Sequence, residues 1–323
     1  RIQPECPVFR TCGGCALLHM DYQEELRMKR RRVEDAMARL GGCPIQVEEM
    51  LGAAETMAYR NKSILAVTDK GGRAQAGFFR ARSHDVVPAA HCLIESDYSA
   101  RAAAAVCRWM DENRVPAYDE KNGKGAVRHI FTRVGRESGE GMVCLVSAEE
   151  RLPLQKLVDA LLDACPETVS IVLNRNRSRG NTVLAGDFQT LWGKAGIQDV
   201  LCGFTFQLAP QSFYQVNPVQ AQRLYERAVE YAGGAGELLE LYCGTGTLSL
   251  CLARRAGHVT GAEIVPEAVE NARENARNNG VKNVDFVCAD AAQAAEAYRH
   301  LGKQPEAVVV DPPRKGLAPQ VIE

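Results

Sequence analysis

Apolar runs and amphipathic stretches alternate through the last third of the chain. The apolar runs predict buried strands at residues 237–242, 258–263, 284–290 and 306–313. Amphipathic stretches predict helices at residues 217–234 and between Pro266 and Gly280. Strands and helices that alternate at this spacing indicate a parallel sheet with crossover helices. Because doubly wound sheets normally have more than four strands, we expect this α/β sheet to be truncated at its C-terminal end, at Glu323.

The region from about residue 45 to 205 contains shorter apolar pieces divided by Gly, Asn and Lys. These pieces predict the strands of an antiparallel α+β module: KSILAVT, RHIFTRVG, GMVCLVS, SIVLN and TVLAG. The stretch LQKLVDALLDAC predicts its clearest helix. Upstream, residues 21–40 predict a charged helix with Leu26, Val33, Met37 and Leu40 on one face. This helix, within residues 18–42, could pack on the C-terminal domain despite its early position.

Composition narrows the class of protein. The chain has 323 residues, of which 46% are hydrophobic and 24% charged, as in ordinary globular proteins. No run of 18 apolar residues is present, so we expect no membrane-spanning helix, and the N-terminus has no secretory signal pattern. We therefore expect a cytoplasmic protein. With 39 Lys and Arg against 40 Asp and Glu, any contact to nucleic acid must come from local patches.

Gly244 and Gly246 follow the first predicted strand and open a helix, where glycine lets the backbone approach a ligand. Glu263 ends the second strand and could accept hydrogen bonds from both ribose hydroxyls of an adenosine cofactor. Asp290 ends the third strand and could contact an adenine amino group. These features alone fit NAD equally well, or a packing turn beside a solvated carboxylate.

The tetrapeptide Asp311-Pro312-Pro313-Arg314 ends the fourth strand and changes this balance. A carboxylate followed by two rigid prolines at this edge faces the ligand crevice. Dehydrogenases do not require such a motif, whereas methyltransferases that act on nucleobases or glutamine amides often have a related one. A turn with a capping aspartate is the structural alternative.

Four of the twelve cysteines form a second group. Cys6, Cys12 and Cys15 lie within ten polar residues, and Cys92, in the segment HCLIES, is the natural fourth ligand. Four thiolates suit either zinc or an iron–sulfur cluster, and the spacing does not choose between them. Most of the remaining cysteines stand singly in apolar stretches, as small buried side chains do.

These motifs and several others occur in an order that resembles one family. The matching stretches are CPVFRTCGGCALLH, YRNK, GFFRARSHDVVPAAHCLI, VRHIFTRVG, LNRNRSRGNTVLAGDFQTLWG, SFYQVNPVQAQRLY, LYCGTGTLSL, GAEIVPEAVENARENARNNG and VVVDPPRKGL. They span nearly the whole chain. The chain resembles the bacterial RNA uracil-5-methyltransferases, specifically the iron–sulfur members that act on 23S rRNA.

The resemblance implies two bound groups. It places a 4Fe–4S cluster on Cys6, Cys12, Cys15 and Cys92. It places S-adenosylmethionine on Gln215, Tyr242, Glu263, Asp290 and Asp311. Phe213 matches an aromatic residue that lies near the target base in relatives, and ordinary packing is its alternative role.

The resemblance also implies covalent catalysis. A cysteine thiolate adds to carbon 6 of uracil, and the resulting enolate at carbon 5 attacks the methyl group. In the family this cysteine stands in an SCNP-type motif, and the base is a glutamate further on. Both are expected after Glu323, so the chain as given is expected to be inactive. Cys243 matches a structural position and is not assigned as the nucleophile.

Three basic groups are candidate RNA contacts. They are the run at Arg27 and 29–32, the alternating Arg175, Arg177 and Arg179, and the group Lys121, Lys124 and Arg128. A solvated helix face is the commoner explanation for the first group. The alternating arginines are the better candidates, and a target base inside folded rRNA must be flipped out to react.

The whole sequence thus predicts two parts and a monomer. Residues 1–205 are expected to form an iron–sulfur, RNA-binding α+β module, and residues 206–323 an incomplete Rossmann-like methyltransferase domain. One alternative is a tRNA uracil-5-methyltransferase, although the best-known tRNA members lack the cluster. Another is a non-catalytic iron–sulfur RNA-binding protein. A zinc-ribbon protein with an NAD domain is disfavoured by Asp311 and the two prolines after it.

Overall fold

The computed structural model describes residues 1–180, 182–300, 304–314 and 316–322. The chain divides into two compact units. The first comprises Arg1–Thr132 and Val143–Leu191, and the second comprises Arg133–Met142 and Trp192–Glu323. The expected functional boundary near residue 206 stays a prediction, because compactness alone does not show which part binds RNA or cofactor.

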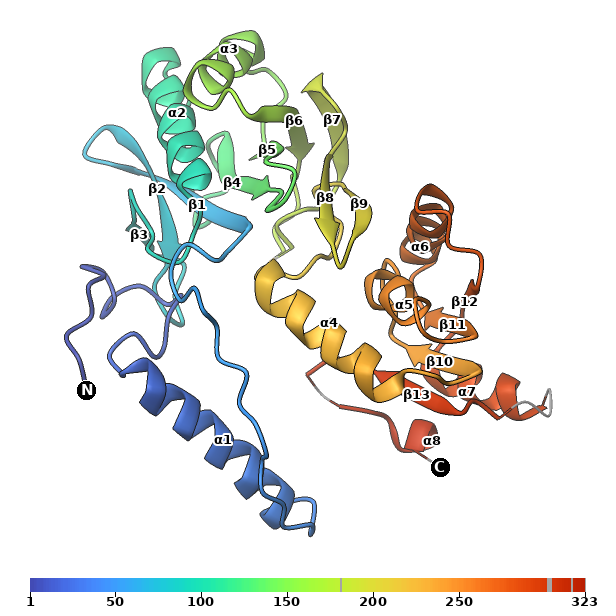
Figure 1. Ribbon diagram of the computed structural model, residues 1–323. Helices are drawn as coiled ribbons and strands as arrows, with labels where there is room; N and C mark the ends of the chain where they lie inside the picture. Colours follow the sequence, from blue (N-terminus) through green and yellow to red (C-terminus); the bar gives the residue numbers. More distant parts are fainter. Residues whose placement is uncertain (181, 301–303, 315, 323) are drawn as a thin grey trace. The chain divides into compact units, whose positions relative to one another are not determined.

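Most of the first unit is built on a seven-stranded sheet in the order β3-β2-β1-β4-β5-β6-β7 (Figure 1). Its strands are β1 (Lys62–Lys70), β2 (Arg73–Phe79), β3 (Val86–Pro88), β4 (Val127–Val134), β5 (Gly141–Ser147), β6 (Thr168–Arg175) and β7 (Asp187–Gly193). Strand β2 pairs antiparallel with both β1 and β3. Strands are confirmed at KSILAVT, RHIFTRVG, GMVCLVS and SIVLN. Nearly every residue of the central strands β4 and β5 is buried, so both faces of the sheet are covered there.

One predicted strand is wrong. The described residues 182–186, in the stretch TVLAG, form no strand. Their carbonyls accept side-chain hydrogen bonds instead of pairing in a ladder: the Asn176 amide donates to Thr182 and Val183, and the Asn174 amide donates to Ala185. Asparagine side chains that bond local backbone groups compete with strand pairing in this way.

Helices α2 (Asp97–Asn113) and α3 (Leu154–Ala164) pack against each other, and α2 also lies against β1 and β2. Helix α3 is confirmed, whereas α2 is not predicted from the sequence. Its signal is Ser96, whose side chain caps the helix, before an alanine-rich run. Trp109 of α2 is 1% exposed and donates its indole N–H to the Pro153 carbonyl at 3.2 Å.

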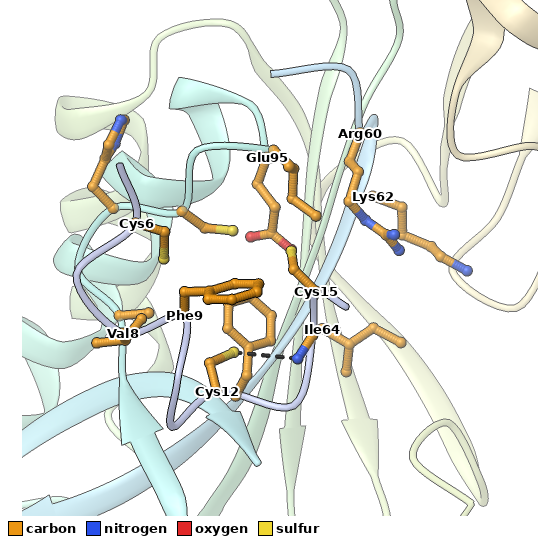
Figure 2. Close-up of a pocket in the computed structure, with 15 residues that line it drawn as sticks. Cys6, Val8, Phe9, Cys12, Cys15, Arg60, Lys62, Ile64 and Glu95 are labelled. Carbon is orange, nitrogen blue, oxygen red and sulfur yellow. Dashed lines mark hydrogen bonds between the residues drawn. The ribbon is translucent and has the colours of Figure 1, made fainter. Parts of the chain in front are cut away.

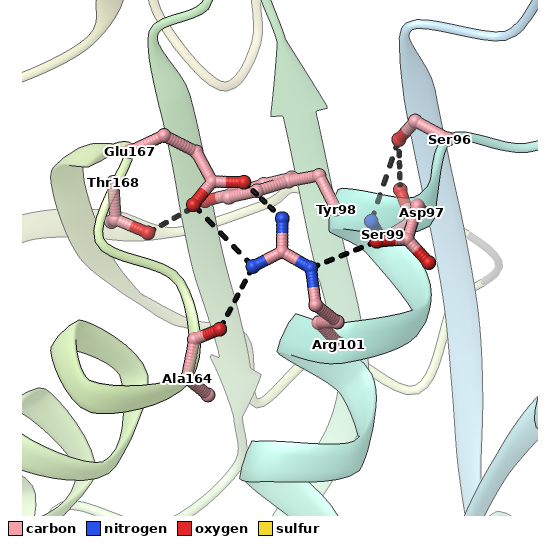
Figure 3. Close-up of polar contacts among 8 residues, drawn as sticks. All are labelled: Ser96, Asp97, Tyr98, Ser99, Arg101, Ala164, Glu167 and Thr168. Carbon is pink, nitrogen blue, oxygen red and sulfur yellow. Dashed lines mark hydrogen bonds and ion pairs between the residues drawn. The ribbon is translucent and has the colours of Figure 1, made fainter.

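Arg101 connects α2 with the end of α3 (Figure 3). Its guanidinium donates to Asp97 Oδ2 at 2.9 Å, to the Ala164 carbonyl at 2.8 Å and to both carboxylate oxygens of Glu167. A planar fork with several donors suits such a set of acceptors better than an ammonium group does. Arg101 therefore fixes the position of α3 relative to α2.

Helix α1 (Tyr22–Arg39) confirms the predicted charged helix, and none of its residues is buried. Asp21 caps it by accepting from Gln23 and Glu24. The predicted apolar face is largely open within the described first unit, with Val33 48% and Leu40 89% exposed. What this face packs on stays a prediction.

The second unit contains a four-stranded sheet in the order β12-β11-β10-β13, in which every pairing is parallel. Its strands are β10 (Glu237–Leu241), β11 (His258–Glu263), β12 (Val284–Cys288) and β13 (Ala307–Val310). The helices are α4 (Pro218–Ala232), α5 (Thr247–Leu252), α6 (Pro266–Asn278), α7 (Ala291–His300) and α8 (Pro319–Ile322). All four predicted strands and the parallel sheet are confirmed.

The second unit also contains an antiparallel hairpin, β8 (Ile197–Leu201) and β9 (Phe204–Leu208). The fully buried Asp199 carboxylate on β8 accepts from the Glu137 N–H at 2.9 Å and from the Tyr214 hydroxyl at 3.4 Å. Arg133 is 1% exposed and donates to the Ala209 and Ser212 carbonyls at 2.9 and 2.8 Å. These buried polar side chains hold the loop that precedes α4.

Across the described ranges, none of the helices is long and apolar enough to cross a bilayer.

Replacing Arg101 with Lys should lower the free energy of unfolding by about 1 kcal/mol, because Lys cannot satisfy the same acceptors. The effect is modest because the Arg101 side chain is 38% exposed. Chemical denaturation measures it. The matched control is Arg39→Lys, whose exposed pair with Asp35 at 3.7 Å should change stability undetectably. Equal losses in both variants would contradict this role for Arg101.

Candidate cofactor site and cysteine cavity

The carboxyl ends of the four parallel strands bring together residues that are far apart in the sequence. Tyr242 follows β10, Glu263 ends β11, Asp290 follows β12 and Asp311 follows β13. Because these strands are neighbours in one parallel sheet, the four residues lie along the same edge. Asp311 is exposed and Glu263 is half-buried. Polar groups that could bind an adenosine moiety are therefore arranged along this edge.

The turn after β10 has room for a ligand at one glycine. Gly244 has φ +55°, and a Cβ added there would meet no atom within 4 Å. Gly246 has φ +77°, but a Cβ there would lie 2.7 Å from the Phe286 ring. Both positions favour glycine because of their left-handed backbone. Gly244 thus leaves open space, whereas Gly246 allows the turn to pack on Phe286.

Glu263 is held in place by backbone donors. Its Oε2 accepts from the Gly244 N–H at 3.2 Å, and its Oε1 accepts from the Val265 N–H at 2.9 Å. One carboxylate thereby links the glycine turn to the end of the neighbouring strand. A carboxylate has about four acceptor sites, so oxygen lone pairs remain for ligand hydroxyls. Asp290 accepts from the Ala292 N–H at 2.9 Å at the start of α7.

Gln215 lies in the loop before α4 and connects to the glycine turn through a chain of side chains. It forms a hydrogen bond with the Tyr225 hydroxyl, which also lies 3.4 Å from Thr247 Oγ1 at the start of α5. Phe213, in the same loop, is 68% exposed. An aromatic ring left so open is not core packing within the second unit, and its face is free to stack on a planar group.

Glu240 is a buried carboxylate that sequence reasoning missed. It lies in the middle of β10 and is 2% exposed. Burial raises the pKa of Glu240 to about 7, and the nearby Asp311 carboxylate adds to the shift although Ser249 donates a hydrogen bond. Its signal in the sequence is an acidic residue between Leu239 and Leu241 of an apolar strand.

Cys243 is unsuited to act as a nucleophile. It is 5% exposed, and burial, followed by the charges of Glu240 and Glu263, raises its pKa far above the ordinary thiol value. Nucleophilic attack requires the thiolate, which this environment disfavours.

The structure brings Cys6, Cys12, Cys15 and Cys92 to one cavity of about 330 Å³ in the first unit. Figure 2 shows the thiols of Cys6, Cys12 and Cys15 around this space, with the Phe9 ring among them. All four are free thiols. Cys6, Cys12 and Cys15 come from the N-terminal loop, and Cys92 comes from the segment before α2. Cys92 follows Cys15 by 77 residues in the sequence.

Local contacts shape the loop that carries three of these cysteines. The Gly14 N–H donates to Cys12 Sγ at 3.3 Å. A Cβ on Gly13 would lie 2.9 Å from the Phe79 carbonyl, so the loop can approach β2 only with glycine there. Arg60 and Lys62 line the same cavity and supply positive charge near the sulfur atoms.

The cavity is not preformed for a single metal ion. Over residues 1–180, 182–300, 304–314 and 316–322, no group of three or more His, Cys, Asp or Glu side chains is placed to hold one ion. In a 4Fe–4S cluster each thiolate binds a different iron atom, so the thiolates lie farther apart than thiolates that share one zinc ion. Four thiols that line one cavity with Arg60, Lys62 and Glu95 form a donor set that suits either zinc or an iron–sulfur cluster.

The predicted basic groups have different surroundings. Arg27 and Lys29 pair with Glu24 and Glu25 along α1. Arg128 is 6% exposed and donates to the carbonyls of Asn176 and Ser178, so it supports the arginine-bearing loop from beneath. Arg179 and Lys121 line a cavity beside this loop. The exposed arginines of the loop, rather than Arg128, are available to a partner.

Comparisons with known proteins agree with this arrangement. Residues 196–323 match the family model described as tRNA (Uracil-5-)-methyltransferase. The chain is 40% identical to an uncharacterized RNA methyltransferase of Clostridium tetani, over 100% of this chain and 71% of the relative. The chain belongs to the RNA uracil-5-methyltransferase family. The expected enzyme class, an RNA (uracil-5-)-methyltransferase, is thereby confirmed.

Two further similar proteins support the assignment of this chain to the methyltransferase family. An uncharacterized RNA methyltransferase of Listeria monocytogenes is 38% identical over 100% of this chain and 72% of the relative. A solved tRNA (uracil-54, C5)-methyltransferase of Pyrococcus abyssi, in complex with S-adenosyl-L-homocysteine, has a TM-score of 0.81 at 28% identity. That match covers 98% of this chain and 72% of the solved chain. The α/β methyltransferase fold is confirmed.

Replacing Glu240 with Gln should change how the stability of the methyltransferase depends on pH. The folded state holds a proton on Glu240 up to about pH 7, whereas the unfolded state releases it near 4.5. Between these values the folded state binds more protons, so the Glu240 contribution to stability falls as pH rises. The Gln variant lacks this loss. Its advantage over the wild type should grow from pH 4.5 to 7, by at most about 3 kcal/mol.

Denaturant titrations of both proteins at pH 5 and pH 8 measure this difference. Glu267→Gln, at an exposed position of α6, is the matched control for the loss of one carboxylate. A Glu240→Gln difference that is the same at both pH values would contradict the raised pKa.

Proposed function

We propose that this methyltransferase transfers a methyl group from S-adenosylmethionine to carbon 5 of a uridine in 23S rRNA. Family membership supports the reaction. The observation that supports rRNA as the substrate is the convergence of Cys6, Cys12, Cys15 and Cys92 on one cavity. These cysteines match the iron–sulfur members of the family that the sequence resembles.

We assign the methyl donor to the carboxyl edge of the four-stranded sheet. Glu263 would accept from the ribose hydroxyls, and Asp290 from the adenine amino group. Gln215, Tyr242 and Asp311 would complete the site. The open space at Gly244 supports this assignment, because the backbone there can approach a ligand without a Cβ in the way.

S-adenosylmethionine would supply the electrophilic methyl group. Uracil carbon 5 is a weak nucleophile until a thiolate adds to carbon 6, forming an enolate that attacks this methyl group. A base then removes the carbon 5 proton, and the thiolate is eliminated. Cys243 is not assigned as this thiolate, because it is buried and burial raises its pKa. We assign Phe213 to stack on the target base, and its exposure of 68% supports this assignment.

We further assign a 4Fe–4S cluster to Cys6, Cys12, Cys15 and Cys92. Methyl transfer needs no redox step, so the cluster would support the fold or RNA recognition of this module.

The exposed loop that carries Arg177 and Arg179 is the proposed contact to RNA phosphates. Arg177 pairs with Glu150 at 2.5 Å, and phosphate would exchange with that carboxylate. Cytoplasmic location and a monomeric state stay predictions.

A tRNA substrate is the second candidate, since the Pyrococcus abyssi structure is named for tRNA uracil-54. The test incubates the natural full-length protein with tritiated methyl donor and either unmodified 23S rRNA or unmodified tRNA. Our proposal expects 5-methyluridine in 23S rRNA. Label in tRNA alone would establish the second candidate, and no label in either RNA would leave a binding protein without this activity.

Replacing Glu263 with Ala should weaken S-adenosylmethionine binding by about 10- to 100-fold, because hydrogen bonds to a charged group are lost. Calorimetric titration of the full-length protein measures this affinity. Glu267→Ala, an exposed substitution near the start of α6, is the matched control and should leave the affinity unchanged. Equal affinities for both variants would place the ribose elsewhere.

Replacing Cys12 with Ser should remove most of the bound iron, because the cluster loses one of four thiolates. Anaerobically purified wild-type protein is expected to carry about four iron ions and as many sulfide ions per chain. Cys43→Ser, at an exposed cysteine outside the cavity, is the control and should keep the metal. One zinc ion and no sulfide in the wild type would contradict a cluster.

A further inference from the structure

Two cysteines outside both proposed sites lie against each other in the second unit. Cys202 is at the turn between β8 and β9, and Cys251 is on α5. They are 6% and 1% exposed and line the same cavity, and the Cys251 thiol donates to the Thr247 carbonyl at 3.2 Å. Neither the glycine turn nor the cysteine cavity of the first unit includes them. Their contact is therefore unexplained by cofactor or cluster binding.

A cavity gives small molecules access to this pair. Cys202 and Cys251 line a space of about 350 Å³ together with Glu226 and Arg254. This volume is many times that of a water molecule, about 30 Å³, so a small neutral oxidant fits.

Charged groups beside the pair favour one thiol as the nucleophile. Arg254 donates to the Cys202 carbonyl at 2.9 Å, and its guanidinium lies 6.0 Å from the Phe204 ring centre. The neighbouring Cys251 thiol and the Arg254 charge lower the pKa of Cys202, although burial and Glu226 oppose the shift. The same contact raises the pKa of Cys251. Cys202 is thus the thiol that ionises first.

We propose that Cys202 and Cys251 form a reversible disulfide on reaction with a hydroperoxide. The Cys202 thiolate attacks one peroxide oxygen, the O–O bond breaks, and the leaving hydroxide takes a proton to become water. Cys251 then loses its proton and attacks the Cys202 sulfenic sulfur, so the S–O bond breaks and a second water leaves. Two thiols are oxidised by two electrons, and one hydrogen peroxide is reduced to two waters.

The bond would tie two elements of the second unit. Cys251 lies on α5, which begins at Thr247 directly after the glycine turn. Cys202 lies on the β8–β9 turn with φ +52°, a backbone conformation that a cysteine adopts only when its surroundings impose it. The disulfide would therefore join the hairpin covalently to the helix that follows the proposed cofactor turn.

The test is a peptide map of the natural full-length protein after limited treatment with hydrogen peroxide. Free thiols are alkylated, and the protein is digested with trypsin without reduction. Cleavage gives peptide 195–223 with Cys202 and peptide 228–254 with Cys243 and Cys251. We expect these peptides as one linked species that dithiothreitol separates. The peroxide dose is chosen as the lowest one that oxidises the exposed Cys43 and Cys288.

Single Cys→Ser variants identify which two cysteines form the disulfide. Cys251→Ser and Cys202→Ser should abolish the linked species, whereas Cys243→Ser should keep it. Fragment spectra of the wild-type species assign the linked sulfur atoms independently, in case a variant does not fold. Separate alkylated peptides at a dose that oxidises Cys43, or a link through Cys243, would overturn the proposal. Neither readout depends on methyl transfer or on metal content.

Discussion

Parallel pairing of β10 with β11 and β13 is the constraint on which the proposed cofactor site depends. The register pairs Leu241 with both Ala262 and Val310, so the strands end together at one edge. Glu263 then reaches the Gly244 N–H, and Asp311 follows the neighbouring strand. A change of register would separate these groups even if every side chain were kept. Backbone hydrogen bonds, more than any single side chain, therefore determine the geometry of the edge.

The interior beneath that edge carries charges at a cost. Glu240 is buried within β10 close to Asp311, and its raised pKa shows that ionisation is unfavourable there. Ser249 partly offsets this by donating a hydrogen bond. Arg133 and Asp199 are also buried, but Arg133 donates to the Ala209 carbonyl and Asp199 accepts from the Glu137 N–H and the Tyr214 hydroxyl, which satisfies much of their hydrogen-bonding need. Buried polar groups thus hold loops whose exposed residues, such as Phe213, face outward.

The sequence predicts repetitive structure better than packing. Alternating strands and helices, with Pro266 and Gly280 as helix boundaries, suffice to predict the four parallel strands, and strand ends identify Glu263, Asp290 and Asp311 as edge residues. The TVLAG stretch has strand-like composition, yet Asn174 and Asn176 bind its carbonyls. Strand-like composition alone does not reveal this competition from nearby asparagine side chains.

Contacts between segments that are distant in the sequence are also hard to predict from it. Cys6, Cys12 and Cys15 are grouped in the sequence, so a common site with Cys92 was predictable. Cys202 and Cys251 stand singly in apolar stretches and read as packing residues, because only the fold places them together. Helix α2 was not predicted, although Tyr98, Ala102, Val106 and Trp109 recur at helical spacing and form the face that packs on α3 and β2.

The most direct test of the proposed cofactor site is a crystal structure of the natural full-length protein with S-adenosyl-L-homocysteine bound. We predict the ribose hydroxyls at the Glu263 carboxylate, the adenine amino group at Asp290, and the homocysteine portion beside the Gly244 turn. A nucleoside bound away from the carboxyl edge of β10 and β11, with Glu263 engaged only by the Gly244 and Val265 N–H groups, would contradict it.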